Sequence, residues 1–251
     1  MKEIIYPPGC KDIQVELAND ELIRRLKKIQ QCFQNMDAKA PEKYNELAMY
    51  LGCELFLQHE HEDVQLLVAC CLADTFRLNY PESPFQDAGD LKNVFLFLAN
   101  QLKGLKDNSN PSFNRYFYLL ENLETTKTFT LCLELDDAQE IIFNLFENVF
   151  KIVNDKTTLK VKSLLFELLH PLLNDSDQIS AKVVDILFMR IIEPQKSNNK
   201  EANSLAVNLL KKGNEHFEFL VQNHLNNISL TSRNTMGHNL TLGTAYNANN
   251  R

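Results

Sequence analysis

The sequence has no tryptophan, and only 7 glycines and 8 prolines among its 251 residues. So few glycines and prolines leave little material for the many tight turns that short strands require. No stretch alternates apolar and polar residues over the length of a strand, and no Asn-Gly pair marks a hairpin. These absences argue against a β-sandwich or a barrel and predict an all-α fold.

Recognisable catalytic signatures are also missing. The chain has no glycine-rich phosphate loop, no Gly-x-Ser-x-Gly, no His-Glu-x-x-His and no EF-hand pattern. Its six cysteines include no Cys-x-x-Cys and fall mostly at apolar helical positions, which favours reduced core thiols over a disulfide framework. We therefore expect no enzyme, no cofactor and no small-molecule substrate.

The sequence also lacks a targeting segment and an excess of positive charge. The first ten residues, MKEIIYPPGC, contain no long apolar run, and no later run approaches the length of a membrane span. The formal net charge is −7, which argues against a surface for sequence-specific nucleic-acid binding. These features predict an intracellular protein that works without a membrane or direct nucleic-acid contact.

What the sequence does contain is one helical stretch that is apolar almost all round, from Asp63 onward. Its apolar or small residues recur at helical spacing, with further ones on the flanks: Val64, Leu67, Val68, Cys71, Leu72 and Thr75. A helix with so little polar circumference is expected between other helices. Two prolines, Pro81 and Pro84, then end it, because the chain cannot stay helical there.

Amphipathic stretches recur along the chain at a regular interval. Every second one begins near Asp20, Asp63, Ser112, Thr158 and Lys200, at intervals of roughly 43, 49, 46 and 42 residues. This period is close to that of two-helix HEAT or armadillo-type repeats, which bury their apolar stripes by stacking. We predict a HEAT-type α-solenoid of about five antiparallel helix pairs, with a closed irregular helical bundle as the alternative.

The same pattern predicts three regions. Residues 1–18 form an irregular lead-in, residues 19–230 form the solenoid, and residues 231–251, rich in Asn, Thr and Gly, form a disordered polar tail. Within the solenoid, a helix after Pro41 is expected to turn Leu55 inward, and a last helix over 214–228 is expected to bury Leu225.

Two clusters resemble metal or acid sites. His59 and His61, with Glu60, Glu62 and the nearby Cys53, offer ligand types for zinc, but no second convergent pair accompanies them, so we expect a solvated loop and no metal. Glu134, Asp136 and Asp137 form a run of acids, and acids are common at the start of a helix.

A third cluster, Arg115 with Tyr116, Phe117 and Tyr118, is read mainly as core packing with the hydroxyls at the rim. The Cys70–Cys71 pair lies in the most apolar stretch, where no cation or histidine is placed by the sequence to lower a thiol pKa. We therefore expect these thiols to be inert.

The loop after the apolar helix is the best candidate binding site. Its residues are Tyr80, Pro81, Glu82, Ser83, Pro84 and Phe85. A stiff connector and a docking groove for a short peptide are about equally good interpretations of a loop that exposes proline and aromatic surface. The Ser83-Pro84 dipeptide is also a weak signal for phosphorylation.

Several segments resemble the N-terminal region of one family, the cohesin-associated regulators named for precocious dissociation of sisters. They are DVQLLVACCLADTFRL, PSFNRYFYLLEN, DELIRRLK, QLKGL and the opening YPPG. The similarity runs from about Tyr6 to Leu230. It implies a non-enzymatic HEAT-repeat scaffold in the nucleus that binds cohesin subunits and acts with the wings-apart-like releasing factor. Members of this family are much longer than this chain.

In that family, a loop resembling Ala-Pro-Asp/Glu-Ala-Pro-Tyr docks a short Tyr-containing motif of such partners. The matching residues here are Tyr80 to Phe85, where both alanines and the final tyrosine differ. The resemblance therefore predicts a scaffold that regulates sister-chromatid cohesion by protein–protein docking. A general HEAT adaptor in trafficking or signalling is the alternative, and a small enzyme would require a deep polar pocket.

Overall fold

The computed structural model describes residues 3–37, 41–223 and 225–226, and the regular secondary structure in these residues is all helical. The elements are α1 (Asn19–Gln34), η1 (Pro41–Tyr44), α2 (Asn45–Leu51), α3 (Glu54–Leu57), α4 (Glu62–Asn79), α5 (Ala88–Gln101), η2 (Leu102–Lys106), α6 (Phe113–Thr125), η3 (Thr128–Glu134), α7 (Ala138–Ile152), α8 (Leu159–Asn174), α9 (Ala181–Ile191), α10 (Gln195–Asn198) and α11 (Lys200–Lys211), where η marks a 3-10 helix. A further helical stretch covers 215–223.

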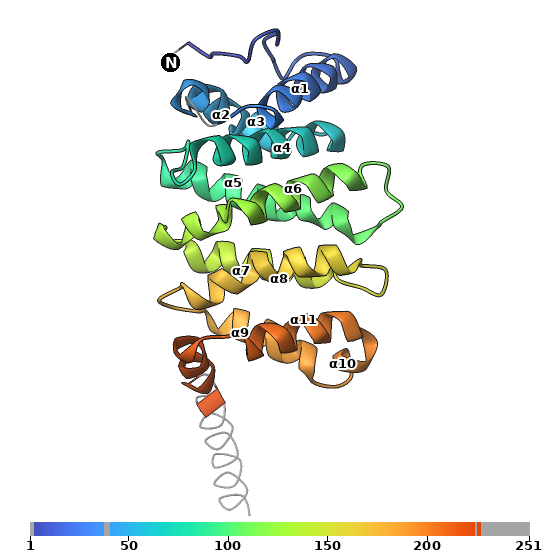
Figure 1. Cartoon of the computed structure of the whole chain (residues 1–251), viewed down its shortest axis with the longest axis vertical. Coiled ribbons are helices and arrows are strands. Elements are labelled where there is room, and N and C mark those ends of the chain that lie inside the picture. Colours follow the sequence, from blue (N-terminus) through green and yellow to red (C-terminus); the bar gives the residue numbers. More distant parts are fainter. Residues whose placement is uncertain (1–2, 38–40, 224, 227–251) are drawn as a thin grey trace, which may run out of the picture.

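The helices form an open, two-layered stack (Figure 1). In one layer α1, α4, α6, α8 and α11 follow one another, each packed on the next, and α5, α7 and α9 do the same in the second layer. The first and last pairs lie at opposite ends of the molecule. The predicted α-solenoid is therefore confirmed, and the alternative of a closed bundle is wrong.

The repeat starts read from the sequence are confirmed. The five helices of the first layer begin at Asn19, Glu62, Phe113, Leu159 and Lys200, each within one residue of its predicted start. Local capping contributes to these boundaries: Thr158 Oγ accepts the Val161 N–H at 3.3 Å, and Asn199 Oδ1 accepts the Ala202 N–H at 3.0 Å. Such caps satisfy backbone donors that the first turn leaves without a partner.

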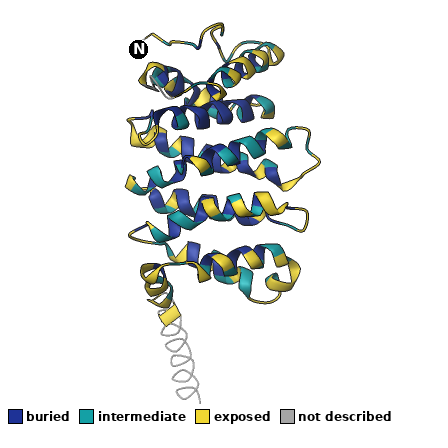
Figure 2. Cartoon of the chain, in the orientation of Figure 1, coloured by how far each residue is buried: buried dark blue, intermediate teal, exposed yellow. Residues whose placement is uncertain are grey.

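Helix α4 is the most enclosed element. Fourteen of its 18 residues are buried, because α1 and α2 cover one side and α5 and α6 cover the other. In Figure 2 it is dark blue along most of its length. The prediction that this helix lies between other helices is confirmed.

The second helix of the first pair is broken, and the inward position predicted for Leu55 is wrong. A Cβ on Gly52 would lie 2.6 Å from the Phe85 ring, so α2 ends where only glycine fits against that ring. The chain turns and resumes as α3, where Phe56 is fully buried and Leu55 is 64% exposed. The break changes the phase of the apolar stripe.

At the other end, helix 215–223 buries Phe217, whereas Leu225, predicted to face inward, is 37% exposed. The predicted tail, 231–251, lies outside the described residues. None of the helices in the described ranges combines the length and apolar character needed to cross a membrane.

Candidate docking groove

The loop between α4 and α5 is tied to its own helices by hydrogen bonds. Asn79 donates its side-chain amide to Thr75 O at 2.8 Å, and its carbonyl accepts the Glu82 N–H at 2.9 Å. Asp87 Oδ1 accepts the Asp90 N–H at 2.9 Å and so caps α5. The loop therefore has a defined shape, fixed at both ends.

The six predicted site residues do not share one environment. Tyr80 is 62% exposed, Pro81 and Glu82 are exposed, and Ser83 is half-buried. Pro84 and Phe85 are buried, Phe85 being only 5% exposed. The expectation that the loop exposes its whole proline and aromatic surface is therefore wrong for its second half.

Phe85 anchors the loop to the core. Its ring centroid lies 5.9 Å from that of Phe76, and the row of rings continues through Phe95 to Phe129 with spacings of 5.8 and 5.5 Å. The other side of the Phe85 ring contacts the backbone at Gly52. Phe85 thus fixes the position of the residues before it rather than offering its own face to a partner.

The loop forms one wall of a groove of about 1070 Å³. The opposite walls come from the N-terminal segment, from η1 and α2, and from η3. Apart from the loop residues 81–86, the lining residues are Glu3, Ile5, Glu42, Lys43, Asn45, Glu46, Met49, Asn79, Leu91, Leu131, Glu134 and Leu135. Tyr80 is not among them.

The groove combines negative charge with exposed apolar side chains. Among the described lining residues there are five glutamates (3, 42, 46, 82 and 134) and one lysine, Lys43, so their formal charge is 1 − 5 = −4. Ile5 and Met49 are 40% and 37% exposed. The buried Asn45 Oδ1 has no hydrogen-bond partner within the described residues. Such a surface offers a basic ligand both charge complementarity and apolar contact.

Sequence patterns indicate only one wall of this groove, the loop 80–85. Glu134, which the sequence suggests is part of a helix-start cluster, ends η3 and lines the groove, while α7 begins four residues later. Glu42 and Glu46 lie at the starts of η1 and α2, where acids are expected for local reasons. No signal in one sequence distinguishes a capping acid from one that also lines a groove.

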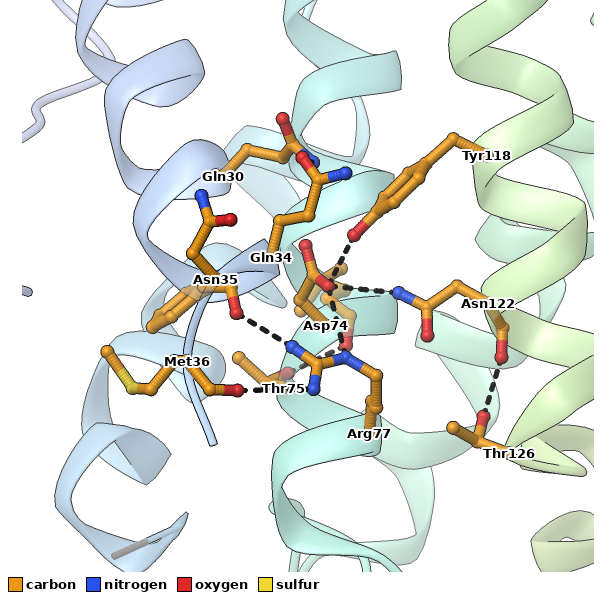
Figure 3. A network of polar contacts seen from close by, with 12 residues as sticks. Gln30, Gln34, Asn35, Met36, Asp74, Thr75, Arg77, Tyr118, Asn122 and Thr126 are labelled. Atoms are coloured by element: carbon orange, nitrogen blue, oxygen red, sulfur yellow. Dashed lines mark hydrogen bonds and ion pairs between the residues drawn. The ribbon is translucent and has the colours of Figure 1, made fainter. Parts of the chain in front are cut away.

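A network of polar contacts is centred on Asp74 of α4 (Figure 3). Asp74, fully buried on α4, accepts the Tyr118 hydroxyl at 2.6 Å and the Asn122 amide at 3.0 Å, both from α6. Arg77 Nε lies 3.5 Å from Asp74 Oδ1, and its guanidinium donates to the carbonyls of Phe33 and Met36 at the end of α1. The network thus joins three successive helices of one layer.

Asp74 is the most perturbed acid of the described residues. Burial raises its pKa to about 6, against the opposing effects of the Tyr118 hydroxyl and Arg77. Its Oδ2 atom has no hydrogen-bond partner in the described part of the chain. Burial and the adjacent Asp74 raise the pKa of Tyr118 in turn. The network has the character of a structural tie, because the Asp74 side chain is fully buried and its partners come from α1 and α6 as well as α4.

Tyr118 also corrects the prediction for the aromatic cluster, since its hydroxyl lies against a buried acid and not at the rim. The other members pack as expected: Tyr116 is buried, and the Phe117 ring lies 4.5 Å from Lys160 Nζ. Arg115 reaches Asp63 at 3.9 Å. The cluster belongs to the interface between repeats.

The histidine loop serves the backbone of α4, and the Cys70–Cys71 pair is buried. His61 Nδ1 accepts the Asp63 N–H at 3.2 Å, and His59 Nδ1 accepts the His61 N–H at 3.1 Å, so both rings serve the start of α4. No group of three metal-ligating side chains occurs in the residues that the structure describes. Burial raises the pKa of the Cys70 and Cys71 thiols, which keeps them protonated.

Comparisons with known proteins place this architecture in a family. The family model for the sister chromatid cohesion protein PDS5 matches residues 20–246. The match continues well past Leu230, where the resemblance read from the sequence stopped. The structure of a Pds5-Scc1 complex contains a chain that superposes with a TM-score of 0.68 at 19% identity, over 82% of this chain and 32% of that one, which shows a shared fold.

Curated relatives agree with this result. The sister chromatid cohesion protein PDS5 homolog A-B of Xenopus laevis is 39% identical over 239 residues, and PDS5 homolog A of Homo sapiens is 38% identical over 237 residues. These alignments cover 94% and 93% of this chain but only 18% of each relative. PDS5 homolog B of Gallus gallus is 37% identical over 237 residues, covering 93% of this chain and 17% of its own length. The chain therefore belongs to the PDS5 family of sister chromatid cohesion proteins.

Proposed function

We propose that this chain is a non-enzymatic, cohesin-associated scaffold of the nucleus that regulates sister-chromatid cohesion through protein–protein docking. Family membership supports the process, since the relatives are sister chromatid cohesion proteins. The fold shared with a protein solved in a Pds5-Scc1 complex supports cohesin subunits as partners. The wings-apart-like releasing factor is the further partner that the sequence resemblance implies.

The docking site of this proposal is the groove beside residues 80–85, and its charge is the observation that carries the choice. Its described lining residues carry five carboxylates against one ammonium group, beside the apolar side chains of Ile5 and Met49. A short peptide with Lys or Arg and one aromatic or apolar anchor complements both features.

The size of the site indicates a weak and reversible complex. A short peptide seated in a groove of about 1070 Å³ contacts one local surface of the solenoid and not a whole face of it. Interfaces that bury less than about 1,200 Å² in total are typical of transient contacts. Because its carboxylates lie at the surface, their attraction for a basic peptide is screened as salt increases. We therefore expect micromolar dissociation constants that rise with ionic strength.

The test measures binding of the full chain to a labelled synthetic peptide that carries the Tyr-containing motif of its wings-apart-like partner together with one added arginine. Glu82→Lys reverses one charge on the groove wall and should weaken binding about tenfold, a loss of about 1.4 kcal/mol. The matched control is Glu60→Lys, the same change at an exposed position before the start of α4. It should leave the dissociation constant unchanged.

Two results would count against the proposal. Equal binding by the native chain, Glu82→Lys and Glu60→Lys would mean that the peptide binds elsewhere on the scaffold. No binding by any of the three would mean that the loop only connects α4 to α5. Recovery of cohesin subunits with the tagged chain tests the wider role. A general HEAT adaptor would recover trafficking or signalling components and leave cohesin behind.

A further inference from the structure

We propose that Ser83 is a phosphorylation site for a proline-directed kinase, and that the phosphoserine strengthens docking of a basic peptide in the groove. The second part rests on the proposed function of that groove. The first part stands on the sequence and geometry of the loop alone.

The sequence singles out one position for this class of kinase. Of the 8 prolines in the 251 residues, only Pro84 follows a serine or threonine, so Ser83-Pro84 is the single Ser-Pro or Thr-Pro pair. A kinase that requires proline directly after the acceptor hydroxyl therefore has one candidate in the chain. This makes the modification site unambiguous to test.

Ser83 lies where a phosphate would change the groove. Its side chain lines the groove, and its Oγ accepts the Phe85 N–H at 3.0 Å. The residues on either side of the Ser83-Pro84-Phe85 segment, Glu82 and Gln86, are exposed. Because Pro84 and Phe85 are buried, the kinase reaches the hydroxyl through a local opening of the loop, which costs less than global unfolding.

The reaction is an ordinary phosphoryl transfer from ATP. Ser83 Oγ forms a bond to the γ-phosphorus while the bond from that phosphorus to the β,γ-bridging oxygen breaks, and ADP leaves. The hydroxyl proton passes to the base of the kinase. A phosphate oxygen can then accept the Phe85 N–H in place of the hydroxyl oxygen, so the turn keeps its hydrogen bond.

The added charge reinforces the existing character of the groove. A phosphoserine carries about −1.5 to −2 charges at pH 7 and three strong acceptor oxygens. The groove already has a formal lining charge of −4 among the described residues. A guanidinium or ammonium group of the docked peptide gains a phosphate partner, and charge-assisted contacts of this kind are stronger than neutral ones. We expect affinity to rise about three- to tenfold at low salt, with a steeper salt dependence.

The first arm of the experiment asks whether the site is used. The full chain is incubated with an active proline-directed kinase and ATP, and the phosphate is located by fragmentation mass spectrometry. Incorporation at Ser83 is expected in the native chain and is expected to disappear in Ser83→Ala and in Pro84→Ala. The second variant keeps the hydroxyl and removes only the proline. Phosphate found elsewhere, or none at all from a kinase active on a control peptide, overturns the assignment.

The second arm measures peptide binding by the phosphorylated and unmodified chains at low and high salt. The probe is the Arg-bearing peptide above, with an Arg→Gln version as its control. Tighter binding of the Arg-bearing peptide alone supports the proposal, whereas unchanged or weaker binding overturns the regulatory part. If neither form binds, the proposed docking function fails, while the mass spectrum still decides the modification site.

Discussion

Helix α4 and the loop that follows it are adjacent in sequence but are held in place in different ways. The helix is enclosed by α1, α2, α5 and α6, and its side chains pack in every direction. The loop has one face to solvent and is attached through Phe85, whose ring lies against Phe76 and Gly52. The burial of a helix can be predicted from the spacing of its apolar residues. The burial of a loop residue depends on contacts with residues that are distant in the sequence.

The first and largest prediction targets the helix. Leu67 is fully buried, so Leu67→Asp places a carboxylate in the stack without a partner. Breaking burial in this way costs several kcal/mol, a large part of the 5–15 kcal/mol that typically stabilises a domain. We expect the cooperative thermal transition, followed by circular dichroism, to disappear or to fall by more than 15 °C, on the order expected for such a loss.

The matched control is Leu159→Asp at the first position of α8, where the side chain is 80% exposed. It should leave the midpoint nearly unchanged, because an acid in the first turn suits the helix dipole. An unaltered thermal transition in Leu67→Asp would show that Leu67 is not buried in the folded protein, and the contrast between an enclosed helix and a partly exposed loop would fail.

The second prediction concerns the loop anchor. Phe85→Ala empties the space between Phe76 and Gly52 and should lower the free energy of unfolding by about 3 kcal/mol, as for other large-to-small core substitutions. Tyr80→Ala, in the same loop but with a 62% exposed side chain, should change it by less than about 0.5 kcal/mol. Denaturant titrations of the two variants provide the measurement. Similar losses for both would mean that the loop is held by its backbone and not by the Phe85 ring.

The third prediction follows from the raised pKa of Asp74, about 6 against an ordinary value of 3.8. The folded protein binds this proton more tightly than the unfolded chain does, so the stability contributed by the neutral acid is present below about pH 4 and is lost as pH rises through 6. Relative to Asp74→Asn, the native chain should therefore lose up to about 3 kcal/mol between about pH 4 and pH 6.5.

Tyr118→Phe sharpens this test. It removes the hydroxyl that donates to Asp74 and favours its charged form, so the pKa should rise further and the loss should extend to higher pH. A constant stability difference between the native chain and Asp74→Asn over this pH range would show that Asp74 is not the titrating group.

The repeat architecture could be predicted from the sequence because each helix of the first layer carries its own apolar stripe and start signals. The burial of Phe56 could not, because α2 ends at Leu51 and the next residue, Gly52, packs against the Phe85 ring, 33 residues away in the sequence. A continuous apolar stripe predicts Leu55 inward, whereas after the break Phe56 is buried and Leu55 is exposed. The local spacing of apolar residues predicts a helix, but it does not predict where a contact with the next repeat coincides with the end of that helix.

The candidate site shows the same limit. The prolines that mark the loop predict a site at Glu82 and Ser83, and both residues line the groove. Ile5, Lys43 and Glu134 line the groove from three other segments, and their spacing in the sequence does not predict that they lie around one groove. Asp74 was missed for a related reason, since one acid in an apolar helix signals burial only when its partners on α1 and α6 are known.

The Asp74 network has a mechanical consequence for the scaffold. Apolar side chains between stacked helices slide past one another at little cost as long as they remain covered, whereas hydrogen bonds are lost within small displacements. Arg77 donates a hydrogen bond to the Phe33 carbonyl of α1, and Asp74 accepts one from Asn122 of α6. Both interactions therefore start from the same turn of α4. These interactions couple α1, α4 and α6, so a lateral displacement of one of these helices is expected to move the other two with it.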